Sequence, residues 1–183
     1  MRTKQEYINL INSRNGFSEN ELIIRKETDI TDLHYESLVK LFDFREWAGI
    51  STLITSAYRP GDSRSHGMGK AYDLILFDQW LKQTIDFMHL WRLATTFPWY
   101  GVGIYFDWSF TNSKGNKIPC TGVHVDNHTG GDRPLRWLRV TKEVEGKDQQ
   151  LYYYQDVVSG LFYNSKLKES MELKDAFKFL RPV

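Results

Sequence analysis

The sequence predicts an α+β domain in which a small, mostly antiparallel sheet is flanked by helices. Three observations support this class. Apolar residues recur at helical spacing near the N-terminus, short segments rich in β-branched and aromatic residues follow, and the helical segments mostly precede the strands. The chain has 183 residues, of which 41% are hydrophobic, so it is long enough for one domain and too apolar to be disordered throughout.

Two helices are expected before the first strand. Lys4–Asn12 forms a short helix that ends near the pair Asn15-Gly16, which suits a C-terminal cap. Thr31 or Asp32 can cap the second helix, in which apolar residues recur at helical spacing, and Gly49 ends it.

The next part of the chain predicts two strands around a long loop. Ile50–Ser56 and Ala71–Phe77 are the strands. The loop between them, Arg59–Lys70, is dense in glycine, serine and charge, and loops of this length in a compact domain are often functional. Trp80–Thr96 is amphipathic and predicts a helix, which Pro98 ends.

Three further strands complete the expected sheet. Gly101–Phe106 and Thr121–His128 are joined by a polar hairpin or loop at Asp107–Pro119, and Leu135–Thr141 is expected to return as another strand.

The C-terminal part of the chain differs in character from the rest. Residues 1–142 are expected to form the main domain, and residues 143–183 an extension packed on it or appended to it. This extension is predicted to contain helices, or a strand plus a helix. Its aromatic run at 151–154 is either core packing or a sugar-binding face.

Charge and composition exclude several classes of partner. Lys and Arg total 24 and Asp and Glu total 23, so the basic excess typical of nucleic-acid-binding proteins is missing. Apolar runs such as Leu74–Phe77 are far shorter than the roughly 20 residues that span a bilayer. The single cysteine, Cys120, excludes an internal disulfide and a four-cysteine zinc site. The polar N-terminus lacks the apolar core of a signal peptide, so we expect cytoplasmic synthesis, and we expect a monomer.

A loop histidine and a strand aspartate form the first pair of candidate metal ligands. His66 lies in the glycine-rich loop, and Asp73 follows seven residues later in the second strand. Glycines let the backbone fold so that the two side chains converge. Such a pair can also be a simple hydrogen-bonded loop contact.

A second group of polar residues alternates along the fourth strand. His124, Asp126 and His128 are two residues apart and would point to one face of the sheet, which is either solvated or a ligand face. Two histidines and one aspartate would make a three-ligand zinc site that leaves the fourth position for water, as in catalytic zinc sites.

These motifs together resemble a known family. SAYRPGDSRSHGMGKAYDL (Ser56–Leu74) resembles the signature S-x-Y-R followed by S-x-H-x-x-G-x-A-x-D of the zinc D-alanyl-D-alanine carboxypeptidases and related phage endolysin peptidases. Lysostaphin and the hedgehog signalling domain belong to the same wider group. The segments GVGIYF, GVHVD and RPLRW resemble the second block of one branch, so the likeness spans Ser56–Trp137 and is specific in combination.

The resemblance implies a zinc peptidase domain in residues 1–142 with a hedgehog/D-Ala-D-Ala-peptidase-like fold. It implies one zinc ion held by His66, Asp73 and His124, and hydrolysis of amide bonds in bacterial peptidoglycan stem peptides through a zinc-activated water. The enzyme would be a D,D-carboxypeptidase or an endopeptidase of the endolysin type. A protein made in the cytoplasm would act on the cell wall once released, which favours a phage or prophage origin.

The sequence departs from the family pattern at positions that bear on catalysis. Arg64 replaces the serine two residues before the first ligand, and Thr121 stands where many members carry the acidic general base. The sequence therefore does not identify the general base. Asp126 is the first candidate and His128 the second, while Asp126 can equally be the partner that fixes the tautomer of a ligand histidine.

Three residues of the first motif are candidates for substrate binding. In the resembled family the arginine that matches Arg59 faces the active site, where a guanidinium can hold a carboxylate or oxyanion through two parallel hydrogen bonds. The alternative is a surface pair with Asp62. Tyr58 and Ser65 are the other two candidates. The missing upstream acid also leaves a second function open, that of a catalytically silent zinc-containing cell-wall-binding or phage structural protein of the same fold.

Overall fold

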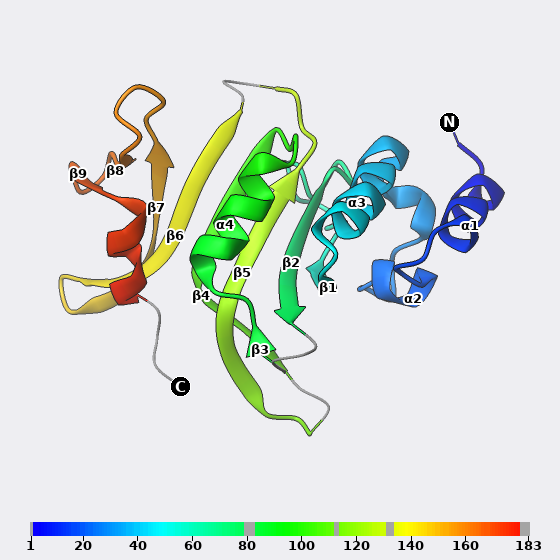
Figure 1. The fold of residues 1–183 in the computed structure, drawn as a ribbon, viewed down its shortest axis with the longest axis horizontal. Helices are drawn as coiled ribbons and strands as arrows, with labels where there is room; N and C mark the ends of the chain where they lie inside the picture. The colour runs from blue at the N-terminus through cyan, green and yellow to red at the C-terminus, as the bar shows by residue number, and fades with distance from the viewer. Residues whose placement is uncertain (1, 79–82, 112–113, 131–133, 180–183) are drawn as a thin grey trace.

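The computed structural model describes residues 2–78, 83–111, 114–130 and 134–179. These residues form one nine-stranded sheet with helices at one end and on one face (Figure 1). The predicted α+β class is confirmed. The prediction of a small sheet is wrong, because the chain beyond residue 142 adds three strands to it.

The helices and strands have the following bounds. The helices are α1 (Lys4–Ser13), α2 (Glu19–Leu22), α3 (Tyr35–Ala48) and α4 (Phe87–Thr96), with short 3₁₀ helices η1 (Ile30–Asp32) and η2 (Leu173–Phe179). The strands are β1 (Ser51–Ser56), β2 (Ala71–Asp78), β3 (Gln83–Thr84), β4 (Gly101–Thr111), β5 (Lys117–Asp126), β6 (Leu135–Val144), β7 (Lys147–Gln155), β8 (Phe162–Asn164) and β9 (Glu169–Met171).

The sheet is mixed, with the strand order β1-β2-β5-β4-β6-β7-β8-β9 and with β3 paired to β2. Strands β4 and β6 are parallel, and the other neighbouring strands among the described residues are antiparallel. The polar segment predicted as a hairpin or loop at Asp107–Pro119 is a hairpin whose two arms extend β4 and β5. Residues 112–113 of that hairpin lie outside the described residues.

Local capping signals explain where the helices begin and end. Thr3 forms a capping box with Glu6 at the start of α1. The helix predicted to begin at Thr31 or Asp32 instead begins at Tyr35, because Asp29 caps the separate turn η1. Gly49 ends α3 as predicted, in the left-handed conformation with φ 63°.

The helix predicted at Trp80–Thr96 is shorter in the structure. Asp86 caps α4 by accepting hydrogen bonds from the backbone N–H groups of Met88 and His89, so the helix begins at Phe87. Residues 83–84 form β3 instead, and residues 80–82 lie outside the described part of the chain.

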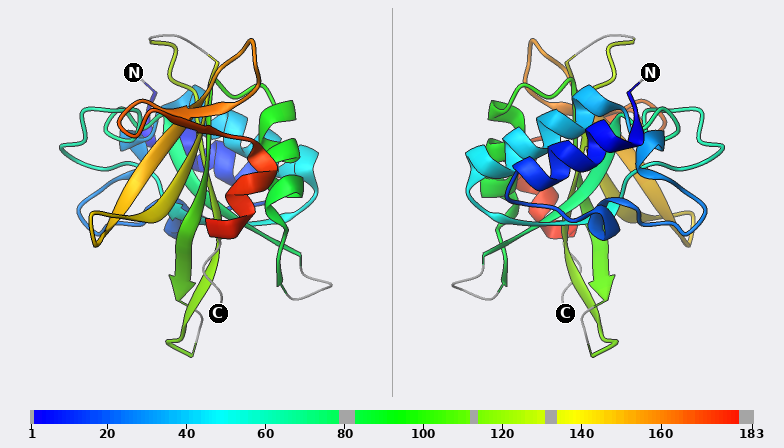
Figure 2. Two further views of the ribbon diagram at one scale, coloured as in Figure 1. Left: turned by 90° about the vertical axis from the view of Figure 1, so that its left-hand side faces the viewer. Right: turned by 90° about the vertical axis from the view of Figure 1, so that its right-hand side faces the viewer.

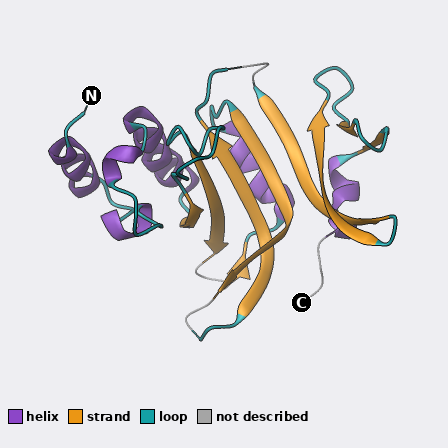
Figure 3. Cartoon of the chain, turned by 180° about the vertical axis from the view of Figure 1, so that it is seen from behind, coloured by secondary structure: helices purple, strands orange, loops and turns teal. Residues whose placement is uncertain are grey.

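One face of the sheet carries the hydrophobic core. Helix α4 lies against this face and buries Phe87, Leu90 and Ala94 (Figures 1 and 2). In the view from behind, the strands lie in front of α4, and no helix of the described residues covers the central strands on that side (Figure 3). The alternation of side chains along each strand therefore separates core residues from a second, open face.

The C-terminal strands continue the sheet and share its core. Strand β6 crosses the boundary predicted between residues 142 and 143 and pairs with β7 from Trp137 to Val144. Tyr153 of β7 and Phe162 of β8 are buried in the core, and Phe162 contacts Trp91 of α4 with ring centroids 5.4 Å apart. The segment predicted as helices, or a strand plus a helix, thus forms three strands followed by η2.

Gly103 of β4 gives a test of this packing. A Cβ atom at this position would lie 2.1 Å from the indole ring of Trp137 on β6. We expect Gly103→Ala to lower the free energy of unfolding by about 1–3 kcal/mol, because the ring must move to admit a methyl group. Urea denaturation would measure this loss. The same substitution in a Trp137→Ala background should cost much less, and equal costs in both backgrounds would contradict the contact.

Candidate metal centre

The pairing of β2 with β5 brings two of the predicted ligands together. In this antiparallel register Asp73 lies opposite His124, and Ala71 lies opposite Asp126. Residues directly opposite each other in a sheet project their side chains from the same face. Asp73 and His124 therefore meet on the open face of the sheet, with small Ala71 beside them.

The loop after β1 delivers the third ligand. Its turn is held by backbone hydrogen bonds from Arg59 N–H to the carbonyl of His66 and from Lys70 N–H to that of Ser65, with N–O distances of 3.2 and 2.9 Å. Gly67 is required here, because a Cβ atom on it would lie 1.6 Å from the backbone carbonyl oxygen of Asp62. The compact loop turns the His66 imidazole toward the sheet.

Three donor atoms converge at this point. His66 Nε2 lies 3.3 Å from Asp73 Oδ1 and 3.3 Å from His124 Nδ1, and the distance between Asp73 Oδ1 and His124 Nδ1 is 2.9 Å. All three residues are buried. Zinc bound tetrahedrally at about 2.0–2.1 Å from each ligand places neighbouring ligand atoms about 3.3 Å apart, so the cluster has the spacing of a metal site.

The outward-facing ring nitrogens of both histidines have partners. His66 Nδ1 donates to the carbonyl oxygen of Ala57 at 2.5 Å, and His124 Nε2 lies 3.3 Å from Asp126 Oδ2. Asp126 Oδ1 in turn accepts a hydrogen bond of 2.9 Å from the backbone N–H of His128. With these partners, the rings turn His66 Nε2 and His124 Nδ1 toward the cluster, which is how metal-binding histidines are oriented.

Arg59 contacts the ligand carboxylate itself. Its guanidinium is hydrogen-bonded to Asp73 Oδ2, and its Nε donates to Ser56 Oγ at 2.7 Å. Asp73 Oδ1 is thereby left to the histidines. Arg59 also lies near Asp62, with Nη1 3.9 Å from Oδ2. Arg59 is thus close to Asp62, as in one of the two predicted interpretations, and also contacts the metal cluster, as in the other.

The charges of the cluster depend on each other. Burial alone would raise the pKa of Asp73, but hydrogen bonds from His124 and His66 hold it well below its usual range. Burial lowers the pKa of His124, whereas hydrogen bonds to Asp126 and Asp73 outweigh this effect and raise it to about 9. In the absence of a cation, His124 therefore carries a proton at neutral pH between two carboxylates, in the place where a cation would neutralise them.

The cluster lies at a cavity of about 550 Å³. Its lining includes Arg59, Ser65, His66, Asp126 and His128 among the predicted site residues. Tyr58, by contrast, is half-buried, packs against the core and does not line this cavity.

The sequence predicted that His128 continues the alternation of the strand. This prediction is wrong, because β5 ends at Asp126. His128 reaches the cavity from the connection that follows. Its ring packs over Gly130, where a Cβ atom would lie 2.7 Å from His128 Nε2. The buried Nδ1 atom has no hydrogen-bond partner among the described residues.

An aromatic wall lies beside the cluster and includes part of the run 151–154, for which the sequence left core packing and a sugar-binding face open. Tyr105 and Trp137 flank His124, with ring centroids 6.3 and 5.0 Å from the imidazole, and Tyr152 and Tyr154 line the same cavity. Burial and the charge of Asp73 raise the pKa of the Tyr105 phenol, so it stays protonated. The signal was present in the spacing of two residues between Tyr152 and Tyr154, which places both on one face once the segment is a strand.

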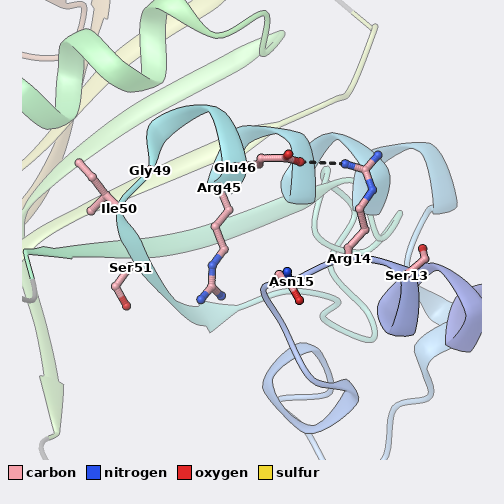
Figure 4. A pocket seen from close by; sticks show the side chains of 8 residues that line it. All are labelled: Ser13, Arg14, Asn15, Arg45, Glu46, Gly49, Ile50 and Ser51. Carbon is pink, nitrogen blue, oxygen red and sulfur yellow. Dashed lines mark hydrogen bonds and ion pairs between the residues drawn. The ribbon is translucent and has the colours of Figure 1, made fainter.

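An unrelated cavity of about 500 Å³ lies between the N-terminal helices and β1, away from this cluster, and is lined by residues in or next to α1, α3 and β1 (Figure 4). Its charged side chains are engaged with each other and with the backbone. Arg14 Nη1 lies 3.2 Å from Glu46 Oε2 and 2.9 Å from Asp43 Oδ1, and Arg45 donates to the carbonyl oxygen of Gly16. It contains none of the predicted site residues.

None of the known protein families, curated proteins and solved structures compared with this chain matches it. Among the helices of the described residues, none is both long and apolar enough to cross a bilayer.

The convergence of three donors predicts the metal content of variants. After incubation with zinc and dialysis, the wild-type chain should retain about one zinc ion, since the three donors and their spacing suit that ion. His66→Ala, Asp73→Ala and His124→Ala should each lose it, because two protein ligands hold zinc too weakly. Elemental analysis would measure the content. His89→Ala, which changes an exposed histidine of α4, is the control and should retain the ion. Full zinc content in any of the three ligand variants would contradict the assignment.

The raised pKa of His124 predicts how the stability of the metal-free protein depends on pH. The pKa of about 9 in the folded protein lies above the ordinary histidine value of 6.5. The stabilisation is therefore fully present below about pH 6.5 and is lost as pH rises through about 9. Asp73, whose pKa is lowered, stays ionised throughout this range. We expect the free energy of unfolding to fall on the order of 3 kcal/mol across it, as measured by urea denaturation with a chelator present.

Asp126→Asn is the matched control for this pH dependence. It removes one of the two carboxylates that raise the pKa of His124, so its stability should vary less over the same range. A wild-type stability that rises between pH 6.5 and 9 would contradict a protonated His124 in the metal-free fold.

Proposed function

We propose that this chain is a zinc-dependent peptidase that hydrolyses amide bonds in bacterial peptidoglycan stem peptides. One observation carries the proposal: two imidazole nitrogens and one carboxylate oxygen lie within 3.3 Å of each other beside a cavity of about 550 Å³. The likeness of Ser56–Trp137 to the D-alanyl-D-alanine carboxypeptidase and endolysin family supports the substrate class. It also supports a hedgehog-like fold for the sheet around the site.

The donor set fits zinc in kind as well as in spacing. His66 Nε2, Asp73 Oδ1 and His124 Nδ1 would hold the ion, and three protein ligands are the number found in catalytic zinc sites. When bound, zinc supplies Lewis-acid chemistry, which polarises a carbonyl group and lowers the pKa of water.

Arg59 contacts a ligand carboxylate and also lines the cavity in which the substrate would bind. Its contacts with Asp73 and Ser56 fix the guanidinium, while the side chain still lines the cavity. We assign it two roles: it orients the ligand carboxylate, and it offers positive charge to the carboxylate or developing oxyanion of the peptide. Ser65, which lines the same cavity next to His66, is assigned to hydrogen-bond the peptide.

The contacts of Asp126 and His128 favour different roles for the two candidate bases. Both carboxylate oxygens of Asp126 are engaged, one with the His124 ring and the other with the backbone N–H of His128. Asp126 is therefore assigned to position His124. His128 lines the cavity, and an imidazole can both accept and donate a proton. We assign His128 to take a proton from water and pass it to the leaving amine.

The alternative function also has an observation in its favour. Thr121, at the position where many members of the resembled family carry an acid, lines a different cavity together with Cys120. A chain without that acid could keep the metal and bind peptidoglycan without cleaving it. Under this alternative, the zinc-loaded protein would sediment with peptidoglycan and release no new amino groups.

Hydrolysis of peptidoglycan tests the proposal directly. Zinc-loaded protein should release free amino groups from purified peptidoglycan, the chelator-treated protein should not, and added zinc should restore the release. Labelling of new N-termini followed by mass spectrometry would identify the bond. His66→Ala should be inactive, and His89→Ala should match the wild type. Equal activity with and without the metal would refute the proposal.

The same assay separates the two candidate bases. His128→Gln should retain zinc and lose about 10²–10⁴-fold in kcat, which is the usual contribution of a general base. Asp126→Asn should instead weaken zinc binding by about 10–100-fold, as expected for the partner of a ligand histidine. If the kcat of Asp126→Asn at saturating zinc falls while that of His128→Gln does not, the assignments must be exchanged.

A further inference from the structure

Three neighbouring strands each carry one aromatic ring on the face of the metal cluster. The sheet register places Trp137 of β6 opposite Tyr154 of β7, and Tyr154 opposite Tyr163 of β8. Tyr154 is 47% exposed and Tyr163 is 45% exposed, whereas the intervening residues Tyr153 and Phe162 point into the core. Trp137, Tyr154 and Tyr163 thus form a row of rings across the strands, called here the aromatic row.

The aromatic row begins at the metal cluster and leads away from it. The ring of Trp137 lies 5.0 Å from that of His124, and Tyr154 lines the metal cavity. Tyr154 also lines a second cavity of about 520 Å³ together with Tyr163. Tyr154 therefore borders both the metal cavity and the cavity beside β8.

The chemistry of this second cavity suits a carbohydrate. Pyranose rings present apolar C–H faces that stack on aromatic rings and hydroxyl groups that hydrogen-bond at the edges. Around Tyr154 and Tyr163 the cavity is lined by polar side chains and one leucine: Gln155, Asp156, Ser159, Ser165, Ser170 and Leu161. Neighbouring strands lie about 4.8 Å apart, which is close to the length of one sugar unit in an extended glycan, so successive rings can meet successive sugars.

Other polymers fit this surface less well. An extended peptide binds best by pairing its backbone with a free strand edge, but the aromatic row lies on a sheet face, where the strands are paired with each other. An anionic membrane surface requires lysine or arginine, and the lining of the second cavity includes neither.

We propose that Tyr154 and Tyr163 bind the glycan strand to which the stem peptide is attached, while Trp137, which is 8% exposed, forms the end of the aromatic row next to the metal cluster. This inference rests on the proposed function, because it places the peptide at the metal cluster and the sugar along β7 and β8. It makes polymeric peptidoglycan the preferred substrate and an endopeptidase-type activity the expected one, since a short free peptide would leave the aromatic row uncovered.

Binding can be tested without metal or hydrolysis. Chelator-treated protein should bind peptide-free wall glycan strands and the hexasaccharide of N-acetylglucosamine in isothermal titration calorimetry. Tyr154→Ala and Tyr163→Ala should each weaken this binding by about tenfold or more, whereas Tyr154→Phe and Tyr163→Phe should keep most of it, because the stacking ring is retained. Tyr100→Ala is the control, since Tyr100 is 41% exposed and lines neither cavity.

The outcomes separate this inference from the proposed function. Glycan binding that survives chelation and depends on Tyr154 and Tyr163 supports the aromatic row even if no bond is cleaved. In the zinc-loaded protein, Tyr163→Ala should raise KM for polymeric peptidoglycan more than it lowers kcat. The inference is overturned if no glycan binds, if the two alanine variants bind glycan as tightly as Tyr100→Ala, or if isolated stem peptides alone bind and depend on these tyrosines.

Discussion

The antiparallel pairing of β2 with β5 is the constraint on which the rest of the site depends. It fixes Asp73 opposite His124, so two donors from residues 51 positions apart meet on directly paired strands. A shift of the register by one residue would send one of the two side chains to the core face. The loop after β1 then needs to supply only His66, and the close approach of Gly67 to Asp62 keeps that loop compact enough to do so.

A carboxylate buried as deeply as that of Asp73 requires compensation. Each of its two oxygens has its own partners, since Oδ2 contacts Arg59 and Oδ1 faces the two histidines. Without a cation, the proton on His124 completes the balance of charge. With one, the proton is displaced and the same atoms become ligands. The arrangement therefore explains both why the pKa of His124 is raised and why the cluster is suited to a cation.

The parts of the site that the sequence could predict are those carried by local spacing. His66, Asp73 and His124 stood out because histidine and aspartate occurred on a glycine-rich loop and on strand positions that should be apolar. The role of Asp126 required the register and the ring orientation of His124, which spacing alone does not contain. The strands beyond residue 142 were missed as a set because aromatic runs fit helices and strands equally well, and only pairing with β6 decides between them.

The connection from β5 to β6 links the cluster to the aromatic row. Because β6 is parallel to β4 and lies on its far side from β5, the chain must pass across the start of β4. There the backbone of Tyr100 joins both strands, since its N–H donates to the carbonyl of Asp126 and its carbonyl accepts from the N–H of Leu135, at 3.0 and 2.8 Å. This crossing brings His128 to the cavity and sets Trp137 over Gly103, next to His124. The position of the proposed base and the start of the aromatic row thus follow from the same topological step.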